Sequence, residues 1–153
     1  MHADARTNPT SDLNQQWLLI SRPTAEPTID NFRFVEVALA PLADGQVRIR
    51  NHYLSLDPYM RGRMSDAKSY APPQALGQVM LGGTVGEVVE STHPKFQPGD
   101  AVVAAGGWQL FATVDASQPG ALRKIPASSI PLSAFLGVCG MPGITAWYGL
   151  NKI

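Results

Sequence analysis

The sequence predicts a mainly β protein, a small and mostly antiparallel barrel with a few short helices. Short runs that alternate between apolar and polar residues recur along the chain, and Gly and Pro separate them at regular intervals. The 153 residues are 44% hydrophobic, which supplies enough apolar surface for one well-filled core. Two full domains would be cramped in this length, so we expect one.

Three local patterns accompany the predicted strands. A break of phase between Phe34 and Val35 predicts a β-bulge, and Asp44-Gly45 is typical of a hairpin turn. The tetrapeptide 97–100, Gln-Pro-Gly-Asp, suits a type II turn because Gly occupies its third position. We expect strands over residues 16–21, 32–39, 46–54, 84–90, 101–105, 110–114 and 122–125.

Composition excludes several classes of function. Twelve basic and twelve acidic residues cancel, and no Lys/Arg run could neutralise a row of phosphates, so nucleic acid is not an expected partner. No apolar run is long enough for a membrane span, and residues 1–15 read as a polar, flexible N-terminal tail without the apolar core of a signal peptide. The single cysteine, Cys139, fits a reducing compartment, so we expect a cytoplasmic protein.

The sequence predicts the barrel over residues 16–130 and a helical segment over residues 131–153. Pro131 suits the first turn of a helix, and the apolar residues that follow lie three and four positions apart, at Ile144, Trp147 and Tyr148. These residues predict an apolar helix face for which the sequence supplies no partner. We therefore expect residues 131–153 to begin the connection to a further domain.

The segment 54–64, LSLDPYMRGRM, is the strongest functional signal. It places an Asp, a Tyr, two Arg and two Met just after a predicted strand, where sheet proteins often carry binding and catalytic residues. Asp57 precedes Pro58, and we expect its carboxylate to cap its own turn by accepting backbone N–H bonds.

Other catalytic sites are not supported by the residues. One cysteine and three histidines without ligand spacing do not form a zinc site, so no metal is expected. The glycines at 82–86 lead into a strand and favour close strand packing, and those at 137–143 precede a helix without a buried strand before it. Neither stretch therefore forms a dinucleotide-binding turn. Cys139 has no nearby basic residue to activate it, so we expect it to be packed. The remaining possibility is chemistry carried by a cofactor.

Four motifs in a fixed order identify a family resemblance. LSLDPYMRGRM, GGTVGEVVES, FQPGDAVV followed by GGWQLFA, and LGVCGMPGITAWYGL are similar to the zinc-independent medium-chain dehydrogenase/reductases. The similar group comprises leukotriene B4 dehydrogenases, prostaglandin reductases, alkenal/alkenone double-bond reductases and curcumin reductases, and the likeness runs from about Trp17 to the last residue. It implies a GroES-like, partly open barrel, the catalytic half of a two-domain enzyme. The Rossmann half is absent from these 153 residues, and the resemblance implies a homodimer at full length.

The resemblance also implies a reaction and its residues. In this family NADPH delivers a hydride to the β-carbon of an enone or enal, and a donor meets the enolate oxygen. Tyr59 matches the position of a catalytic, substrate-contacting residue, although packing at a domain interface is an alternative for its ring, and the nicotinamide ribose hydroxyl is another possible proton donor. Four more residues are candidate substrate contacts from their residue types and their places in the sequence, namely Met60, Arg61, Trp108 and Tyr70. Core packing is the alternative for Met60 and Trp108, and a structural cation is the alternative for Arg61. The positions that the resemblance implies to lie beside the nicotinamide are Met141, Gly143 and Thr145, with Thr145 hydrogen-bonding the carboxamide.

Two other functions remain open at this point. A GroES-like module that only binds or assembles would need no cofactor half. A quinone reductase of the same superfamily would share the architecture and differ in substrate. The sequence beyond Ile153 distinguishes the first alternative, because an enzyme requires a βαβ unit with a Gly-rich turn there.

Overall fold

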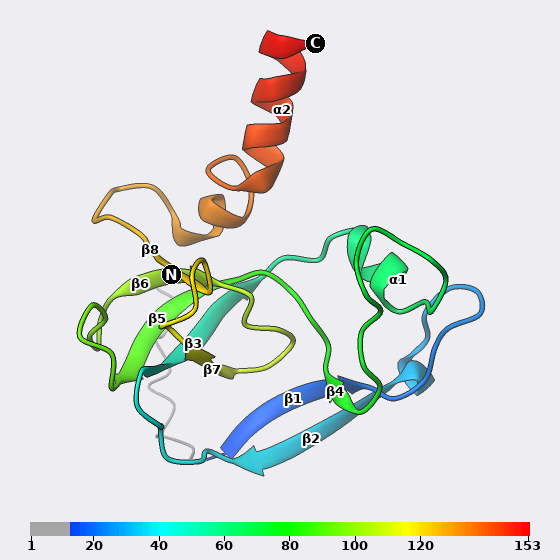
Figure 1. Ribbon diagram of the computed structural model, residues 1–153, viewed down its shortest axis with the longest axis horizontal. Helices are drawn as coiled ribbons and strands as arrows, with labels where there is room; N and C mark the ends of the chain where they lie inside the picture. Colours follow the sequence, from blue (N-terminus) through cyan, green and yellow to red (C-terminus); the bar gives the residue numbers. More distant parts are fainter. Residues whose placement is uncertain (1–12) are drawn as a thin grey trace, which may run out of the picture.

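The strands form two antiparallel sheets that curve into a partly open barrel. Figure 1 shows the computed structural model, which describes residues 13–153. One sheet has the strand order β2-β1-β4 and the other β7-β3-β5-β6-β8, and every pairing in the described residues is antiparallel. The elements are β1 (Leu13–Leu19), η1 (Ile29–Asn31), β2 (Phe32–Ala38), β3 (Gln46–Leu54), α1 (Tyr59–Arg63), β4 (Gln78–Val79), β5 (Thr84–Ser91), β6 (Ala101–Ala104), β7 (Phe111–Asp115), β8 (Leu122–Lys124), η2 (Leu132–Leu136) and α2 (Met141–Lys152). The prediction of a mainly β, GroES-like barrel is confirmed.

The first strand begins earlier than the sequence pattern indicates. Residues 1–12 of the predicted tail lie outside the described residues, whereas residues 13–15 belong to β1. The polar Asn14 is only 4% exposed, because its amide donates hydrogen bonds to the Phe111 carbonyl (2.7 Å) and to Gln109 Oε1 (3.0 Å), and its Oδ1 accepts one from the Phe111 N–H (2.9 Å). Asn14 therefore joins β1 of one sheet to β7 of the other.

Replacing Asn14 by alanine is expected to destabilise the barrel by about 2 kcal/mol, because the Phe111 N–H and C=O would lose their partners at a buried position. The measurement is the free energy of unfolding in denaturant. Gln15→Ala is the matched control, since it removes only an exposed bond to Glu36 and should cost about 0.5 kcal/mol or less. Equal losses in the two variants would contradict a bridging role for Asn14.

The predicted bulge at Phe34 and Val35 is wrong. The β1–β2 register runs without a shift from Leu13 opposite Ala38 to Leu19 opposite Phe32, and the register shifts lie instead between β3 and β5. Strand β2 is an edge strand, and most of its residues on both faces are exposed, so its apolar residues need not all face the core.

The two predicted turns have different outcomes. The 97–100 turn is confirmed, because Gly99 has a φ of +91° and the Asp100 N–H donates to the Gln97 carbonyl at 3.1 Å. Gly45 also adopts a positive φ, of +78°. It does not close a hairpin, however, because β2 and β3 lie in different sheets.

Three apolar clusters fill the interior. The first occupies the curved five-stranded sheet, the second lies between β1 and α1, and the third attaches η2 to the barrel. Their buried members are Val47, Ile49, Val88, Val102 and Ala104; Leu19, Met60, Met64 and Met80; and Val85, Ile125 and Phe135, respectively.

Helix α2 projects away from the barrel, as Figure 1 shows. It has no buried residue, and its large apolar side chains are exposed, with Ile144 at 68%, Trp147 at 58% and Leu150 at 87%. The predicted apolar helix face therefore has no partner within the described residues.

Candidate active site

The segment after β3 folds into the short helix α1. The Ser55 N–H donates to the Gly83 carbonyl (2.9 Å), which holds the end of β3 against the start of β5. The main-chain carbonyl of Asp57 accepts the Met60 N–H at 3.0 Å and so closes the first turn of the helix. The prediction that the Asp57 carboxylate caps this turn is wrong, because the helix start has no side-chain cap. The Asp57 carboxylate is left to face a pocket.

Helix α1 is fixed by contacts on its other side. Met60 and Met64 are buried with Leu19 and Met80. Arg61 donates to the main-chain carbonyls of Pro23 (3.2 Å) and Ala25 (2.7 and 3.2 Å). These contacts anchor the helix to the segment after β1 and leave Tyr59, which precedes them, beside the pocket.

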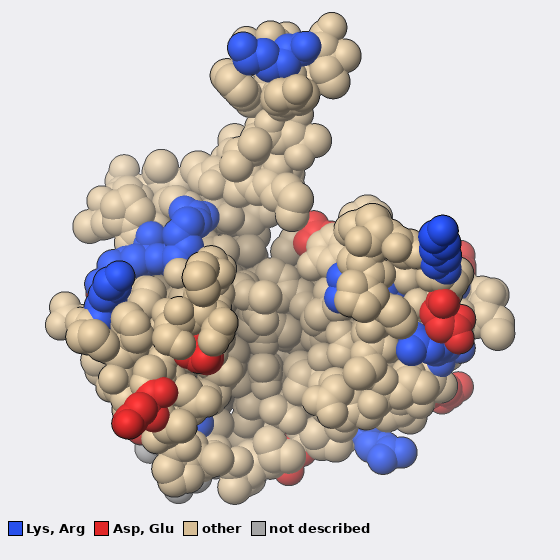
Figure 2. Space-filling view, viewed as in Figure 1, with Lys and Arg blue, Asp and Glu red and all other residues tan. Residues whose placement is uncertain are grey.

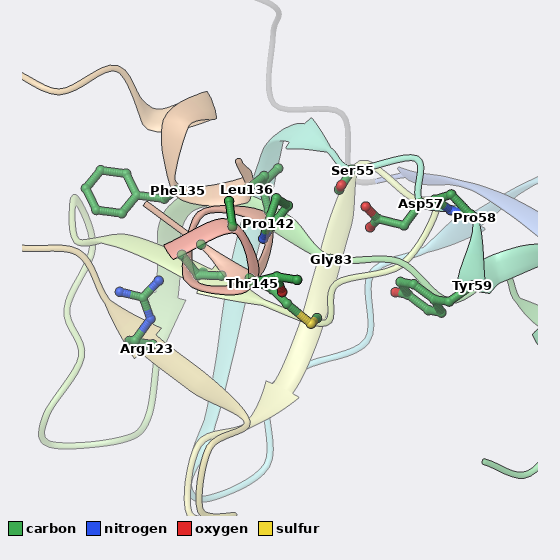
Figure 3. A pocket seen from close by; sticks show the side chains of 14 residues that line it. Ser55, Asp57, Pro58, Tyr59, Gly83, Arg123, Phe135, Leu136, Pro142 and Thr145 are labelled. Carbon is green, nitrogen blue, oxygen red and sulfur yellow. The ribbon is translucent and has the colours of Figure 1, made fainter. Parts of the chain in front are cut away.

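A pocket of about 620 Å³ lies between the start of α1, the ends of β-strands and the first turns of α2. This volume is in the range that small-molecule sites occupy. Figure 3 shows Asp57 and Tyr59 on one side, Arg123 and Phe135 on the other, and Leu136, Pro142 and Thr145 between them. Its lining residues are Ser55, Asp57, Pro58, Tyr59, Gly83, Val103, Arg123, Phe135, Leu136, Gly140, Met141, Pro142, Thr145 and Ala146.

Charge is sparse around this site. In Figure 2 charged side chains of both signs are scattered over the visible face, whereas the hollow below the foot of α2 is largely uncharged. Among the lining residues only Asp57 and Arg123 carry charge. The site is therefore suited to a largely apolar ligand with a few polar groups.

The Tyr59 hydroxyl is held in its protonated form. Partial burial raises the pKa of Tyr59 above its ordinary value of 10.0, the Asp57 carboxylate raises it further, and Arg63 opposes these effects. A phenol with a raised pKa stays a hydrogen-bond donor at neutral pH. Because the folded-state pKa is the higher one, this group contributes stability below pH 10, and the contribution is lost as the pH rises through the raised pKa.

Titration of the phenols is expected to show this shift. The ultraviolet phenolate signal of the chain minus that of Tyr59→Phe should have its midpoint above 10.0, the ordinary value for tyrosine. A difference midpoint at or below that value would contradict the environment described for Tyr59.

The structure brings together three of the residues that the resemblance implies, Tyr59, Met141 and Thr145, which all line the pocket. Gly143 is adjacent but does not line it. A Cβ at Gly143 would clash with the Val138 carbonyl, so the first turns of α2 themselves require glycine there.

The other candidate substrate contacts lie outside the pocket lining. Met60 is in the core and Arg61 is bound to main-chain carbonyls. Trp108 packs in the second cluster and stacks on Phe32, with ring centroids 5.3 Å apart and planes 13° apart. Tyr70 is 86% exposed and is close enough to Tyr59 to contribute to its raised pKa.

Several lining residues were not predicted from the sequence. Ser55 lies within the segment 54–64, which offered a local signal for it. No local sequence signal marked Arg123 or Leu136, because these residues reach the pocket from β8 and η2 through tertiary contacts. Cys139 is half-buried against the third cluster.

Residues 13–153 contain neither a metal-binding cluster nor a helix that could span a membrane. No three His, Cys, Asp or Glu side chains in this range are grouped so that they could hold a metal ion. No helix in this range has the length and apolar character needed to cross a bilayer.

The architecture described above is an antiparallel barrel with an apolar pocket at the foot of a projecting helix. It agrees with the family to which the chain belongs. The chain belongs to the family described as the N-terminal domain of oxidoreductase, whose family profile matches residues 15–122. It is 51% identical over 140 residues to the NADPH-dependent curcumin reductase of Escherichia coli (strain K12), a match that covers 92% of this chain and 40% of that protein.

Two further relatives agree with this assignment. The NADP(+)-dependent 2-alkenal reductase of Nicotiana tabacum is 36% identical over 144 residues, covering 92% of this chain and 41% of that protein. The crystal structure of CurA in complex with NADPH from Vibrio vulnificus has a TM-score of 0.80 at 46% identity, covering 91% of this chain and 40% of that chain. The chain thus spans about two fifths of the length of the relatives it matches.

Proposed function

We propose that the chain is the substrate-binding, catalytic domain of an NADPH-dependent oxidoreductase that reduces the C=C bond of α,β-unsaturated ketones or aldehydes. The observation that carries the proposal is the position of Tyr59 on an apolar pocket at the foot of α2, where burial and Asp57 raise the pKa of its hydroxyl. The relatives described as NADPH-dependent curcumin reductase and NADP(+)-dependent 2-alkenal reductase support it. The complete enzyme would include a nucleotide-binding domain after the barrel.

The residues at the foot of α2 fit the nicotinamide end of NADPH. Met141, Pro142 and Ala146 present an apolar surface that suits a flat ring. The Thr145 hydroxyl lines the same pocket and has no hydrogen-bond partner among the described residues, so it is available to the carboxamide. When bound, NADPH would supply a hydride to the β-carbon of the substrate.

Tyr59 is the group proposed to stabilise the charge that develops on the substrate. Its O–H would donate to the carbonyl oxygen, and the bond would strengthen as that oxygen becomes an enolate. Asp57 supports this role because its negative charge disfavours loss of the Tyr59 proton. Protonation of the α-carbon has two candidate donors, the Tyr59 hydroxyl and the ribose hydroxyl of the cofactor.

The test is oxidation of NADPH by the full-length protein in the presence of benzalacetone, a simple aromatic enone. Saturable turnover is expected, with NADH a weaker donor. Turnover with quinones alone would favour a quinone reductase. Absence of turnover with enones, enals and quinones, together with a reading frame that lacks a Gly-rich strand–turn–helix after Ile153, would favour a binding module.

We also propose that the full-length protein is a cytoplasmic homodimer. The single cysteine fits a reducing compartment. Sedimentation of the full-length protein tests the oligomeric state, and a monomer at micromolar concentration would contradict it.

A further inference from the structure

The two charges of the pocket lie at opposite ends. Figure 3 shows Asp57 and Tyr59 on one side of the pocket and Arg123 on the other, the side on which Phe135 also lies. No ion pair joins Asp57 to Arg123. The lining between them is dominated by apolar residues, among them Val103, Leu136 and Pro142. The pocket therefore has a negatively charged residue at one end and a positively charged residue at the other.

The Arg123 guanidinium has no charged or hydrogen-bonding partner among the described residues. Side chains alternate along β8, so Lys124 points away from the pocket, where it pairs with Asp100 at 2.6 Å and lies over the Phe96 ring. Arg123 lines the pocket, and its side chain has no hydrogen bond or ion pair among the described residues. Its guanidinium is thus a free donor of several N–H groups at one end of a largely apolar site.

We propose that Arg123 is a specificity-determining residue that binds the carboxylate of an anionic substrate. This inference rests on the proposed function and names its substrate class, an enone or enal with an apolar body and a carboxylate at the end remote from the carbonyl. A guanidinium matches a carboxylate with two parallel N–H···O bonds.

Both charges favour the same orientation of such a substrate. Arg123 attracts the carboxylate to its end of the pocket, and Asp57 repels it from the Tyr59 end. The neutral carbonyl group is thereby directed to the Tyr59 hydroxyl. Because Arg123 is exposed, solvent screens the attraction, and we expect a preference of about fivefold for the anionic substrate.

The experiment compares para-carboxybenzalacetone with its methyl ester as substrates of the full-length protein. The wild type should show a kcat/KM about fivefold higher for the acid, and this preference should shrink as ionic strength rises. Arg123→Gln should abolish the preference by lowering kcat/KM for the acid about fivefold more than for the ester. Arg33→Gln, which removes an exposed charge on β2 outside the pocket, should alter neither substrate.

Three outcomes would overturn the proposal: no preference in the wild type, an equal loss for acid and ester in Arg123→Gln, or a raised KM for NADPH with an unchanged acid-to-ester ratio. The last would assign Arg123 to a cofactor phosphate. Binding of the saturated keto acid and its ester, measured by NMR titration, separates this inference from the reductase proposal. An Arg123-dependent preference for the acid without any turnover would support carboxylate binding while contradicting reduction.

Discussion

Tyr59→Phe is expected to lower kcat/KM for enone reduction by about 100-fold, because one hydrogen-bond donor to a developing oxyanion typically contributes that much. The ring of Tyr59 packs against the cluster that contains Met60 and Met64, and phenylalanine preserves this contact. The fold should therefore be unaffected, and steady-state kinetics of the full-length protein report the loss of the hydroxyl alone.

Tyr70→Phe is the matched control. Tyr70 is 86% exposed and does not line the pocket, so removal of its hydroxyl should change kcat/KM by less than about twofold. If Tyr59→Phe retained full activity, Tyr59 would be reduced to a packing role, and the charge on the substrate would have to be stabilised by another group.

Gly86→Ala is expected to destabilise the protein by about 3 kcal/mol or more. Gly86 on β5 pairs with Asn51 on β3, and a Cβ at this position would overlap the Arg50 carbonyl oxygen and lie 2.9 Å from its carbon. The neighbouring atoms belong to the backbone of the β3–β5 pairing, so they cannot move aside without separating these two strands. Denaturant unfolding measures the effect.

Gly149→Ala supplies the control. Gly149 lies in α2, and apart from the helix's own nearby backbone no atom lies within 4 Å of the point where an alanine Cβ would sit. Alanine favours a helix over glycine by about 0.5–1 kcal/mol. This variant should be neutral or slightly more stable. A Gly86→Ala protein within about 1 kcal/mol of the wild type would refute the close approach of β3 and β5.

Much of the fold follows from local patterns. Strands such as β3 could be predicted because side chains alternate with period two, and the 97–100 turn because only glycine suits its third position. The burial of Asn14 could not, since it depends on hydrogen bonds to Phe111, which is distant in the sequence. The two-residue strand β4 is too short to show any period.

The site was predictable only in part for the same reason. Tyr59 lies five residues after the end of β3, and its segment could be singled out by local composition. The sequence does not reveal which face of α1 meets the core, so Met60 and Arg61 could not be separated from Tyr59 as pocket residues. Arg123 is brought to the pocket by the pairing of β8 with β6, which local sequence does not specify.

The most direct test of the central claim is the position of the transferred hydrogen. The full-length protein would be incubated with benzalacetone and NADPH deuterated at the hydride-bearing nicotinamide carbon, and the product examined by NMR. C=C reduction predicts a saturated ketone with deuterium on the β-carbon. An allylic alcohol with deuterium on the former carbonyl carbon, or no product at all, would contradict it.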